Sequence, residues 1–240
     1  MKSFSVTDVG IKRKVNQDYV FVSEEPIGIL PNLFIVADGM GGHNAGDLAS
    51  KYCVESVLEY IKVSREQTYV SVLEAAIQHA NDKLLEKAEE DSELVGMGTT
   101  FVAATVENNQ MLVANIGDSR LYVLDDKITQ ITKDHSLVEI MVENGEIEPQ
   151  DAKHHPNKNV ITRAVGASIK CNPDFFEVEL NEEDIVLLCS DGLSNMMEDE
   201  DMLQIVNEAT HDFERAAKTL VERANDNGGK DNIAIIIFKQ

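Results

Sequence analysis

Aspartates recur in this chain where an apolar segment meets a turn that contains glycine. Asp38 follows five consecutive apolar residues and precedes glycines at positions 39, 41 and 42. Asp118, Asp191 and Asp231 have similar surroundings, because each lies beside an apolar run and within two residues of a glycine. Glycine leaves room for a ligand next to the backbone. One such acid is typical of an ordinary turn, but four junctions of the same kind favour a shared site.

These acids suit metal chemistry if the strand ends converge at one rim. Together with Asp18, which begins a β-rich segment, they would form a cluster that cannot stay ionised without cations. All-oxygen ligands favour magnesium, manganese or calcium over zinc. Two ions that share one carboxylate would activate a water molecule and suit displacement at phosphorus. Arg13 would hold the phosphate as a bidentate fork, although its segment viewed alone is more typical of a solvated turn.

Composition limits the partners and the fold class. With 43 acidic and 21 basic residues the formal charge is -22, which argues against a nucleic-acid backbone or an anionic membrane as partner. The 240 residues show no linker and contain 43% hydrophobic residues, enough for a sizeable core. No apolar run approaches the roughly 20 residues of a membrane span, and the first residues lack a signal-peptide pattern, so a cytoplasmic protein is expected. The three scattered cysteines indicate neither disulfides nor zinc.

The apolar pattern predicts the elements that must position the acids. Helical spacing predicts helices over 44–63 and from about 65 to 88, the second with a capping box at 64–67. Two further helices are expected at 200–209 and 213–224. Strands are expected at 4–7, 33–37, 101–106, 111–116, 121–124, 128–132, 174–179, 185–190 and 233–238. Short connections between the strands from 101 to 132 require antiparallel neighbours.

Residues 133–158 interrupt the strand pattern with a polar region that holds a short amphipathic stretch at 137–143. An insertion of this kind in a sheet protein is often a mobile functional loop. His154 and His155 within it suggest metal or acid–base chemistry. Neighbours in sequence rarely face one ion, so solvated positions are expected for this pair.

Eight short motifs follow one another in the order found in one known family. They are Arg13-x-x-Asn16-Gln17-Asp18, Val36-Ala37-Asp38-Gly39-Met40-Gly41-Gly42-His43, Gly98-Thr99-Thr100, Gly117-Asp118-Ser119-Arg120, Asp134-His135-Ser136, Thr162-Arg163-Ala164-Val165-Gly166, Cys189-Ser190-Asp191-Gly192-Leu193 and Gly229-Lys230-Asp231-Asn232. Any one of them is weak, whereas eight in register over residues 4–238 are specific. The chain resembles the metal-dependent serine/threonine protein phosphatases of type 2C, the PPM family, and most of all their compact bacterial members.

The resemblance implies an α+β fold, a four-layer α/β/β/α sandwich of two antiparallel sheets flanked by helix pairs. A binuclear Mn²⁺ or Mg²⁺ centre would lie at one end of the sheets. Residues 1–240 would form a single catalytic domain, with residues from about 137 to 158 as the variable flap beside the active site. The implied reaction is hydrolysis of phosphoserine and phosphothreonine monoesters on proteins. A hydroxide that bridges the two ions would attack directly, and no phosphoenzyme would form.

The resemblance also implies ligands for the two ions. Asp38 would bridge both ions, and the carbonyl of Gly39 would bind one of them. Asp191 and Asp231 would complete the shell of the second ion. Asp18 would act directly or through ordered water.

Further implied roles concern the phosphate, a third ion and the partners. Arg13 would hold the substrate phosphate, and Asp118 with Asp191 would carry a third, weaker ion. The substrates would be phosphorylated proteins, and the family context implies a serine/threonine kinase of opposing action. A monomer is the default expectation.

Two departures from the family pattern affect the site. Gln17 stands where many eukaryotic members have a glutamate, so one carboxylate is replaced by a neutral amide, which favours the water-mediated of the two routes from Asp18 to the metal. Met40 stands where those members have a histidine, and it cannot protonate the leaving oxygen. The sequence does not identify the general acid. Water is the first candidate, and His43 and a flap histidine such as His154 are the others.

Three rival interpretations compete with this assignment. An inactive scaffold of the same fold is disfavoured because Asp38, Asp191 and Asp231 are all present. A calcium-stabilised structural domain is disfavoured because no EF-hand loop occurs. A phosphatase for small molecules or nucleotides remains the alternative within the enzyme class.

Overall fold

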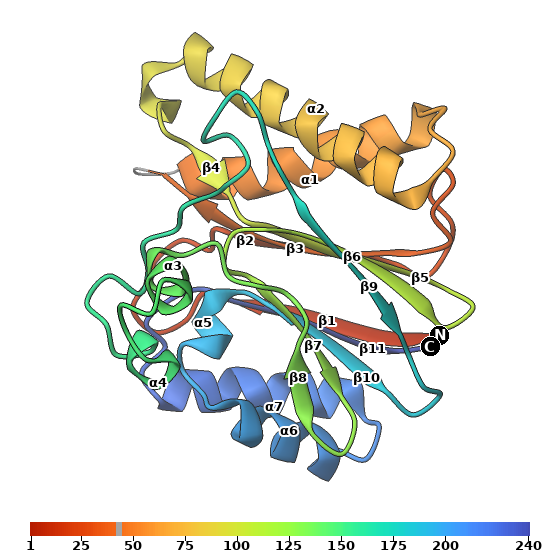
Figure 1. Ribbon diagram of the computed structural model, residues 1–240, viewed down its shortest axis with the longest axis vertical. Helices are drawn as coiled ribbons and strands as arrows, with labels where there is room; N and C mark the ends of the chain where they lie inside the picture. The colour runs from red at the N-terminus through yellow and green to blue at the C-terminus, as the bar shows by residue number, and fades with distance from the viewer. Residues whose placement is uncertain (42–44) are drawn as a thin grey trace.

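The computed structural model describes residues 1–41 and 45–240. Two β-sheets lie face to face, and helices cover the outer side of each (Figure 1). α1 (Ala45–Val63) and α2 (Tyr69–Glu90) cover one sheet, whereas α6 (Asp199–Glu208) and α7 (Phe213–Asp226) cover the other. The predicted α+β class and four-layer α/β/β/α sandwich are confirmed.

Both sheets are antiparallel, as the short connections required. The first has the strand order β1-β11-β10-β7-β8 and the second the order β2-β3-β5-β6-β9, with β4 paired to the end of β3. The strands of the first sheet are β1 (Lys2–Asp8), β11 (Ile233–Lys239), β10 (Ile185–Cys189), β7 (Arg120–Leu124) and β8 (Ile128–Gln130). Those of the second are β2 (Asp18–Ser23), β3 (Leu33–Met40), β5 (Phe101–Glu107), β6 (Gln110–Ile116), β9 (Asp174–Glu179) and β4 (Gly98–Thr99).

Apolar side chains fill the three spaces between the four layers. Between the sheets, Phe34 of β3 stacks on Phe238 of β11 with ring centroids 4.1 Å apart. The side of α7 that faces its sheet carries residues at helical spacing, namely Ala216, Ala217, Leu220, Val221 and Ala224. Burial of this apolar surface is the main force that holds the layers together. The sheets therefore provide a fixed frame for the loops at their ends.

The remaining helices are short and lie near one end of the sandwich. They are η1 (Ser92–Leu94), α3 (Leu137–Glu143), α4 (Pro149–Ala152) and α5 (Asp191–Ser194). In Figure 1, α3, α4 and α5 gather at one end of the sheets, whereas both chain termini lie at the other. α3 coincides with the amphipathic stretch predicted at 137–143. Within the described residues, no helix combines the length and the apolar composition needed to cross a membrane.

One predicted helix start is wrong. α2 begins at Tyr69, and its capping box is formed by Thr68 and Ser71 rather than by residues 64–67. Thr68 Oγ1 accepts a hydrogen bond of 3.1 Å from the Ser71 N–H. Ser64 Oγ instead accepts from the N–H of Glu66, only two residues on, and such a local turn competes with the helix.

Candidate metal centre

Asp18 and Asp38 lie opposite each other because β2 and β3 are antiparallel neighbours in the register that pairs these two residues. The Asp38 N–H donates to Thr100 Oγ1 over 2.9 Å, which fixes the end of β3. Ser190, directly after β10 in the other sheet, donates its hydroxyl to Asp18 Oδ2 over 2.7 Å. The two sheets therefore meet at this pair of carboxylates.

Asp191 and Asp231 reach the same place from the other sheet. Asp191 is the first residue of α5, two residues after the end of β10, and Asp231 lies two residues before β11. These strands are hydrogen-bonded neighbours. Asn195 Nδ2 donates to Asp191 Oδ2 over 2.8 Å, and Arg13 Nη2 donates to Asp231 Oδ2 over 2.7 Å. The structure thus brings together the strand ends whose convergence the sequence interpretation assumed.

A cavity of about 260 Å³ opens at this end of the sandwich. Six of the predicted site residues line it, namely Arg13, Asp38, Gly39, Asp118, Asp191 and Asp231. Asp18, the seventh, is buried behind this wall and pairs in register with Asp38. The predicted site residues are therefore neighbours in space, although they come from widely separated parts of the chain.

Gly39 stands where two backbone segments come too close for a side chain. A Cβ atom at this position would lie 1.9 Å from the carbonyl oxygen of Gly46 in α1. The Gly39 N–H donates to the carbonyl oxygen of Gln17 over 3.0 Å. Only glycine lets α1 pack this closely, so the backbone itself forms part of the cavity wall. A backbone carbonyl is an oxygen ligand of the kind that hard cations use.

The carboxylates destabilise one another's charged forms. Burial is the main cause that raises the pKa of Asp18 to about 8, and the charges of Asp191 and Asp231 raise it as well, while the hydrogen bond from Ser190 opposes them. Burial, followed by the charge of Asp191, raises the pKa of Asp118 to about 8. Burial and then the charge of Asp231 raise the pKa of Asp191 to about 6.

Asp38, at the centre of the group, follows the same rule. Its pKa lies well above the ordinary value, first because of burial and then because of the charges of Asp18, Asp191, Asp118 and Asp231. Buried acids crowded in this way take up protons unless cations neutralise them. The site is therefore built for positive charge.

Two buried carboxylate oxygens of the predicted site residues have no hydrogen-bond partner in the described chain, Asp18 Oδ1 and Asp191 Oδ1. A buried oxygen without a partner is costly, and a cation is one way to satisfy it. The described His, Cys, Asp and Glu side chains form no group of three already gathered around one point. An ion bound here would draw the carboxylates together and complete its shell with water and backbone carbonyls, as Mg²⁺ does.

A histidine clamps the turn that carries Asp118. The Gly117 N–H donates to Nδ1 of His135 over 3.1 Å, and the His135 N–H donates back to the Gly117 carbonyl over 2.9 Å. Because Nδ1 accepts, the proton resides on Nε2, which lies 3.0 Å from Asp174 Oδ2 and donates to it. Arg163 donates to the other oxygen of Asp174 over 2.9 Å. The position of Asp118 thus depends on contacts from β9 and from the loop after residue 158.

Sequence reasoning missed the residues that hold the acids in place, including Ser190, Asn195 and His135. Asn195 carries a local signal, because it follows Asp191 by four residues and so lies on the same side of a helical turn. Ser190 and His135 occur inside quoted motifs, but their partners lie far away in sequence, so no local pattern reveals the contacts.

The two candidate histidines for the proton donor and Met40 differ in what the structure shows of their position relative to the aspartates. His43 lies outside the described residues. His154 lines a neighbouring cavity, which shares Asp118 and Asp191 with the first one but does not include Asp38. Met40 lines the cavity with the aspartates, as its place after Gly39 suggested.

Comparisons with known proteins agree with this arrangement. Residues 11–235 match the family model described as protein phosphatase 2C. The chain is 39% identical over 241 residues to the serine/threonine phosphatase stp of Listeria innocua, covering 98% of this chain and 94% of the relative. It is 38% identical over 237 residues to the protein phosphatase PhpP of Streptococcus pneumoniae, covering 97% of this chain and 94% of the relative.

Solved structures show the same fold. The chain is similar to the serine/threonine phosphatase Stp1 of Staphylococcus aureus, with a TM-score of 0.92 and 34% identity over all of this chain and 94% of the other. It is also similar to the catalytic domain of the serine/threonine protein phosphatase PstP in complex with two manganese ions. That comparison gives a TM-score of 0.85 and 32% identity, covering 98% of this chain and 96% of the other.

Proposed function

The chain belongs to the protein phosphatase 2C family and is a metal-dependent serine/threonine protein phosphatase of the bacterial type, and we propose that it works at the carboxylate cluster around Asp38. The observation that carries this assignment is the set of buried carboxylates with raised pKa values around one cavity. Its substrates are phosphoserine and phosphothreonine monoesters on proteins.

The proposed ligands are the oxygens that line or back the cavity. Asp38 and the carbonyl of Gly39 would hold the first of two ions, Mn²⁺ or Mg²⁺, and Asp38 would also hold the second together with Asp191 and Asp231. Asp18 supports the pair from behind Asp38. When bound, the ions supply a nucleophilic water at neutral pH and offset the charge that develops on the phosphoryl group.

A third ion is proposed between Asp118 and Asp191. Both residues line the same cavity, and the charge of Asp191 is one cause of the raised pKa of Asp118. A cation shared by them would remove that repulsion.

Arg13 is the proposed phosphate-binding group. It lines the cavity, and its ion pair with Asp231 uses only one of the five N–H donors of a guanidinium. The same pair raises the pKa of Arg13, so the guanidinium keeps its charge. A phosphate bound here would be oriented for in-line attack by water.

No side chain is needed as the nucleophile. All three cysteines are buried, and burial raises the pKa of both Cys171 and Cys189 to about 12, so neither supplies a thiolate. Met40, which lines the cavity, cannot donate a proton. We therefore assign protonation of the leaving serine or threonine oxygen to water, with His154 as the flap residue to be tested against it.

The wider assignment is supported by the relatives rather than by the cavity. We propose that residues 1–240 act as one catalytic domain, with residues 137–158 as the flap. The partner implied by phosphoprotein chemistry is a serine/threonine kinase of opposing action. A monomeric state and a cytoplasmic location stay predictions.

The decisive experiment measures phosphate release from a phosphothreonine peptide with Mn²⁺, with and without a chelator. We expect release that requires the metal and is lost in Asp38→Asn. No release from the peptide would favour an inactive scaffold. Release from small aryl or nucleotide phosphates alone would favour a small-molecule phosphatase. Trapping of a covalent phosphoenzyme would contradict attack by water.

A further inference from the structure

A second cavity, of about 350 Å³, adjoins the metal centre. It lies between the 137–158 segment and the helices α5 and α6, and Asp118 and Asp191 line it as well as the first cavity. A third, smaller cavity of about 160 Å³ also contains Asp191. Lys158 and Lys230 line both of these additional cavities. The two lysines therefore stand beside Asp191, at the edge of the proposed catalytic site.

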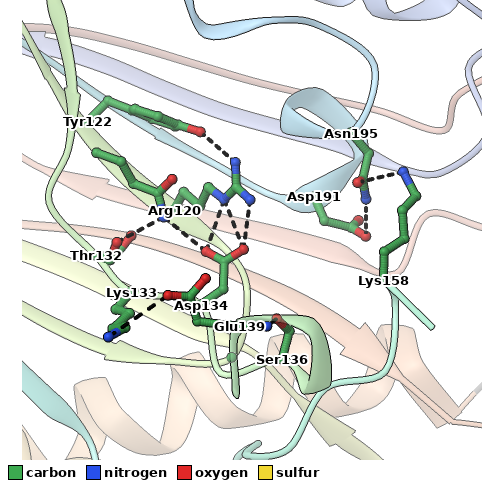
Figure 2. Close-up of polar contacts among 12 residues, drawn as sticks. Arg120, Tyr122, Thr132, Lys133, Asp134, Ser136, Glu139, Lys158, Asp191 and Asn195 are labelled. Carbon is green, nitrogen blue, oxygen red and sulfur yellow. Dashed lines mark hydrogen bonds and ion pairs between the residues drawn. The ribbon is translucent and has the colours of Figure 1, made fainter. Parts of the chain in front are cut away.

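Two ion pairs lie among the charged residues around the larger cavity. Arg120 forms a bidentate ion pair with Asp134, with contacts of 2.9 and 2.7 Å, as Figure 2 shows. Lys153 pairs with Glu198 over 2.5 Å. The charges within each of these pairs offset each other, whereas Asp199, which also lines the cavity, has no hydrogen-bond partner for its Oδ1 among the described residues.

Lys158 and Lys230 differ from their neighbours, because in the described part of the chain neither forms an ion pair with a carboxylate. Lys158 Nζ donates to the neutral Asn195 Oδ1 over 3.0 Å, and Asn195 in turn donates to Asp191 (Figure 2). Burial lowers the pKa of Lys158, and the charge of Lys230 lowers it as well. The two ammonium groups thus oppose each other, and an anion between them would relieve the repulsion.

The rest of the molecule makes this positive charge unusual. The formal charge of the chain is -22, so its general field repels an acidic substrate. Arg13 lines the first cavity but not the second, and it is assigned to the phosphate that is cleaved. Lys158 and Lys230 are therefore available to a different group of the same substrate.

We propose that Lys158 and Lys230 form a second anion-binding subsite, which takes a carboxylate or a second phosphate on a residue close to the phosphorylated serine or threonine. The proposal rests on the proposed function, because it concerns the substrates of the same centre. It predicts that the enzyme prefers phosphopeptides with an acidic neighbour, in spite of its own negative charge.

Matched phosphothreonine peptides test the subsite. One series carries a glutamate at successive positions on either side of the phosphothreonine, and a second series carries glutamine at the same positions. A third replaces the glutamate by a non-hydrolysable phosphonate, which distinguishes a phosphate-selective site from a site for either anion. At low salt we expect kcat/KM for at least one glutamate or phosphonate peptide to exceed that of its glutamine partner by roughly three- to tenfold.

The variant Lys158→Gln/Lys230→Gln should abolish this ratio, since glutamine keeps a donor for Asn195 but removes the charge. Lys218→Gln is the matched control, because Lys218 on α7 is exposed and pairs with Glu214. It should keep the full preference. Because the measured quantity is a ratio between two peptides, a general loss of rate in the double variant does not affect the conclusion.

Two outcomes would overturn the subsite: equal kcat/KM for all paired peptides with the unaltered enzyme, or an unchanged preference in the double variant. Failure of the proposed function has a different signature, namely no hydrolysis of any peptide in the presence of Mn²⁺. In that case fluorescence anisotropy of the same labelled peptides measures binding alone, and equal affinities for the glutamate and glutamine peptides would reject the subsite.

Discussion

Removal of the metal ions should make the folded chain lose stability as the pH rises from about 5 to 8. Asp18 and Asp118 have pKa values of about 8 in the folded chain, whereas an unfolded aspartate has a value of about 3.8. Between these values the folded state holds a proton that the unfolded state has released. The stability that these protonated carboxyl groups give to the folded state is therefore complete below pH 3.8 and is lost as the pH rises toward 8.

The expected size follows from the same linkage. Each such group lowers the free energy of unfolding by at most about 1.4 kcal/mol per pH unit within this window. Asp18 and Asp118 both face the charge of Asp191, so the combined slope should lie between about 1.4 and 3 kcal/mol per pH unit. Even over one pH unit, a loss of this size is large against the total free energy of unfolding of a typical protein, roughly 5–15 kcal/mol. Bound Mg²⁺ should flatten the slope, because it favours the ionised carboxylates.

Urea unfolding measures this effect. It is followed by far-ultraviolet circular dichroism, because the chain contains no tryptophan for a fluorescence signal. The titration is repeated at several pH values with a chelator and with excess Mg²⁺. Asp118→Asn should reduce the metal-free slope by about 1.4 kcal/mol per pH unit. Asp126→Asn, in the exposed turn between β7 and β8, is the control and should leave the slope unchanged. A metal-free stability that stays level or rises between pH 5 and 8 would refute the reasoning.

Three further substitutions test separate parts of the centre. Asp38→Asn should abolish activity and weaken Mn²⁺ binding in calorimetry, and a near-normal rate would mean that Asp38 does not bridge the ions. Arg13→Ala should mainly raise KM while the metal content by elemental analysis stays constant, so loss of metal would show a structural role instead. Arg120→Met should lower the free energy of unfolding by roughly 3–5 kcal/mol, because it leaves the largely buried Asp134 carboxylate without its ion pair. Arg120→Met/Asp134→Leu should recover much of that loss in urea unfolding, and an equal or larger loss would contradict this account.

Local sequence patterns predicted the elements well, because most of them have one apolar side or are apolar throughout. The strands β5, β6, β7 and β10 and the helices α1, α6 and α7 match the predicted segments closely. α2 was the exception, since its start depends on which of several polar side chains bonds the first free N–H groups. The predicted cap at 64–67 and the observed cap at Thr68 stand only a few residues apart, and periodicity does not choose between two such positions.

For the site, the sequence predicted the residues but not the contacts that bring them together. The repeated strand–Asp–Gly pattern singled out Asp38, Asp118, Asp191 and Asp231, but their convergence had to be assumed or taken from the family resemblance. The contacts that create it join distant residues, such as the hydrogen bond between Ser190 and Asp18, which are 172 positions apart. Such pairing depends on how the two sheets pack, and no window of local sequence contains it.

The two halves of the centre belong to different sheets, and this explains why the predicted loss of stability concerns the whole sandwich. Asp18 and Asp38 come from β2 and β3, whereas Asp191 and Asp231 flank β10 and β11. Besides the Ser190 contact, the Gln17 N–H donates to Asn232 Oδ1 over 2.9 Å across the same seam. When all four carboxylates ionise without cations, their repulsion acts to separate the layers at this end. Cations bound between them reverse that force, so metal binding and the closure of the two sheets stabilise each other.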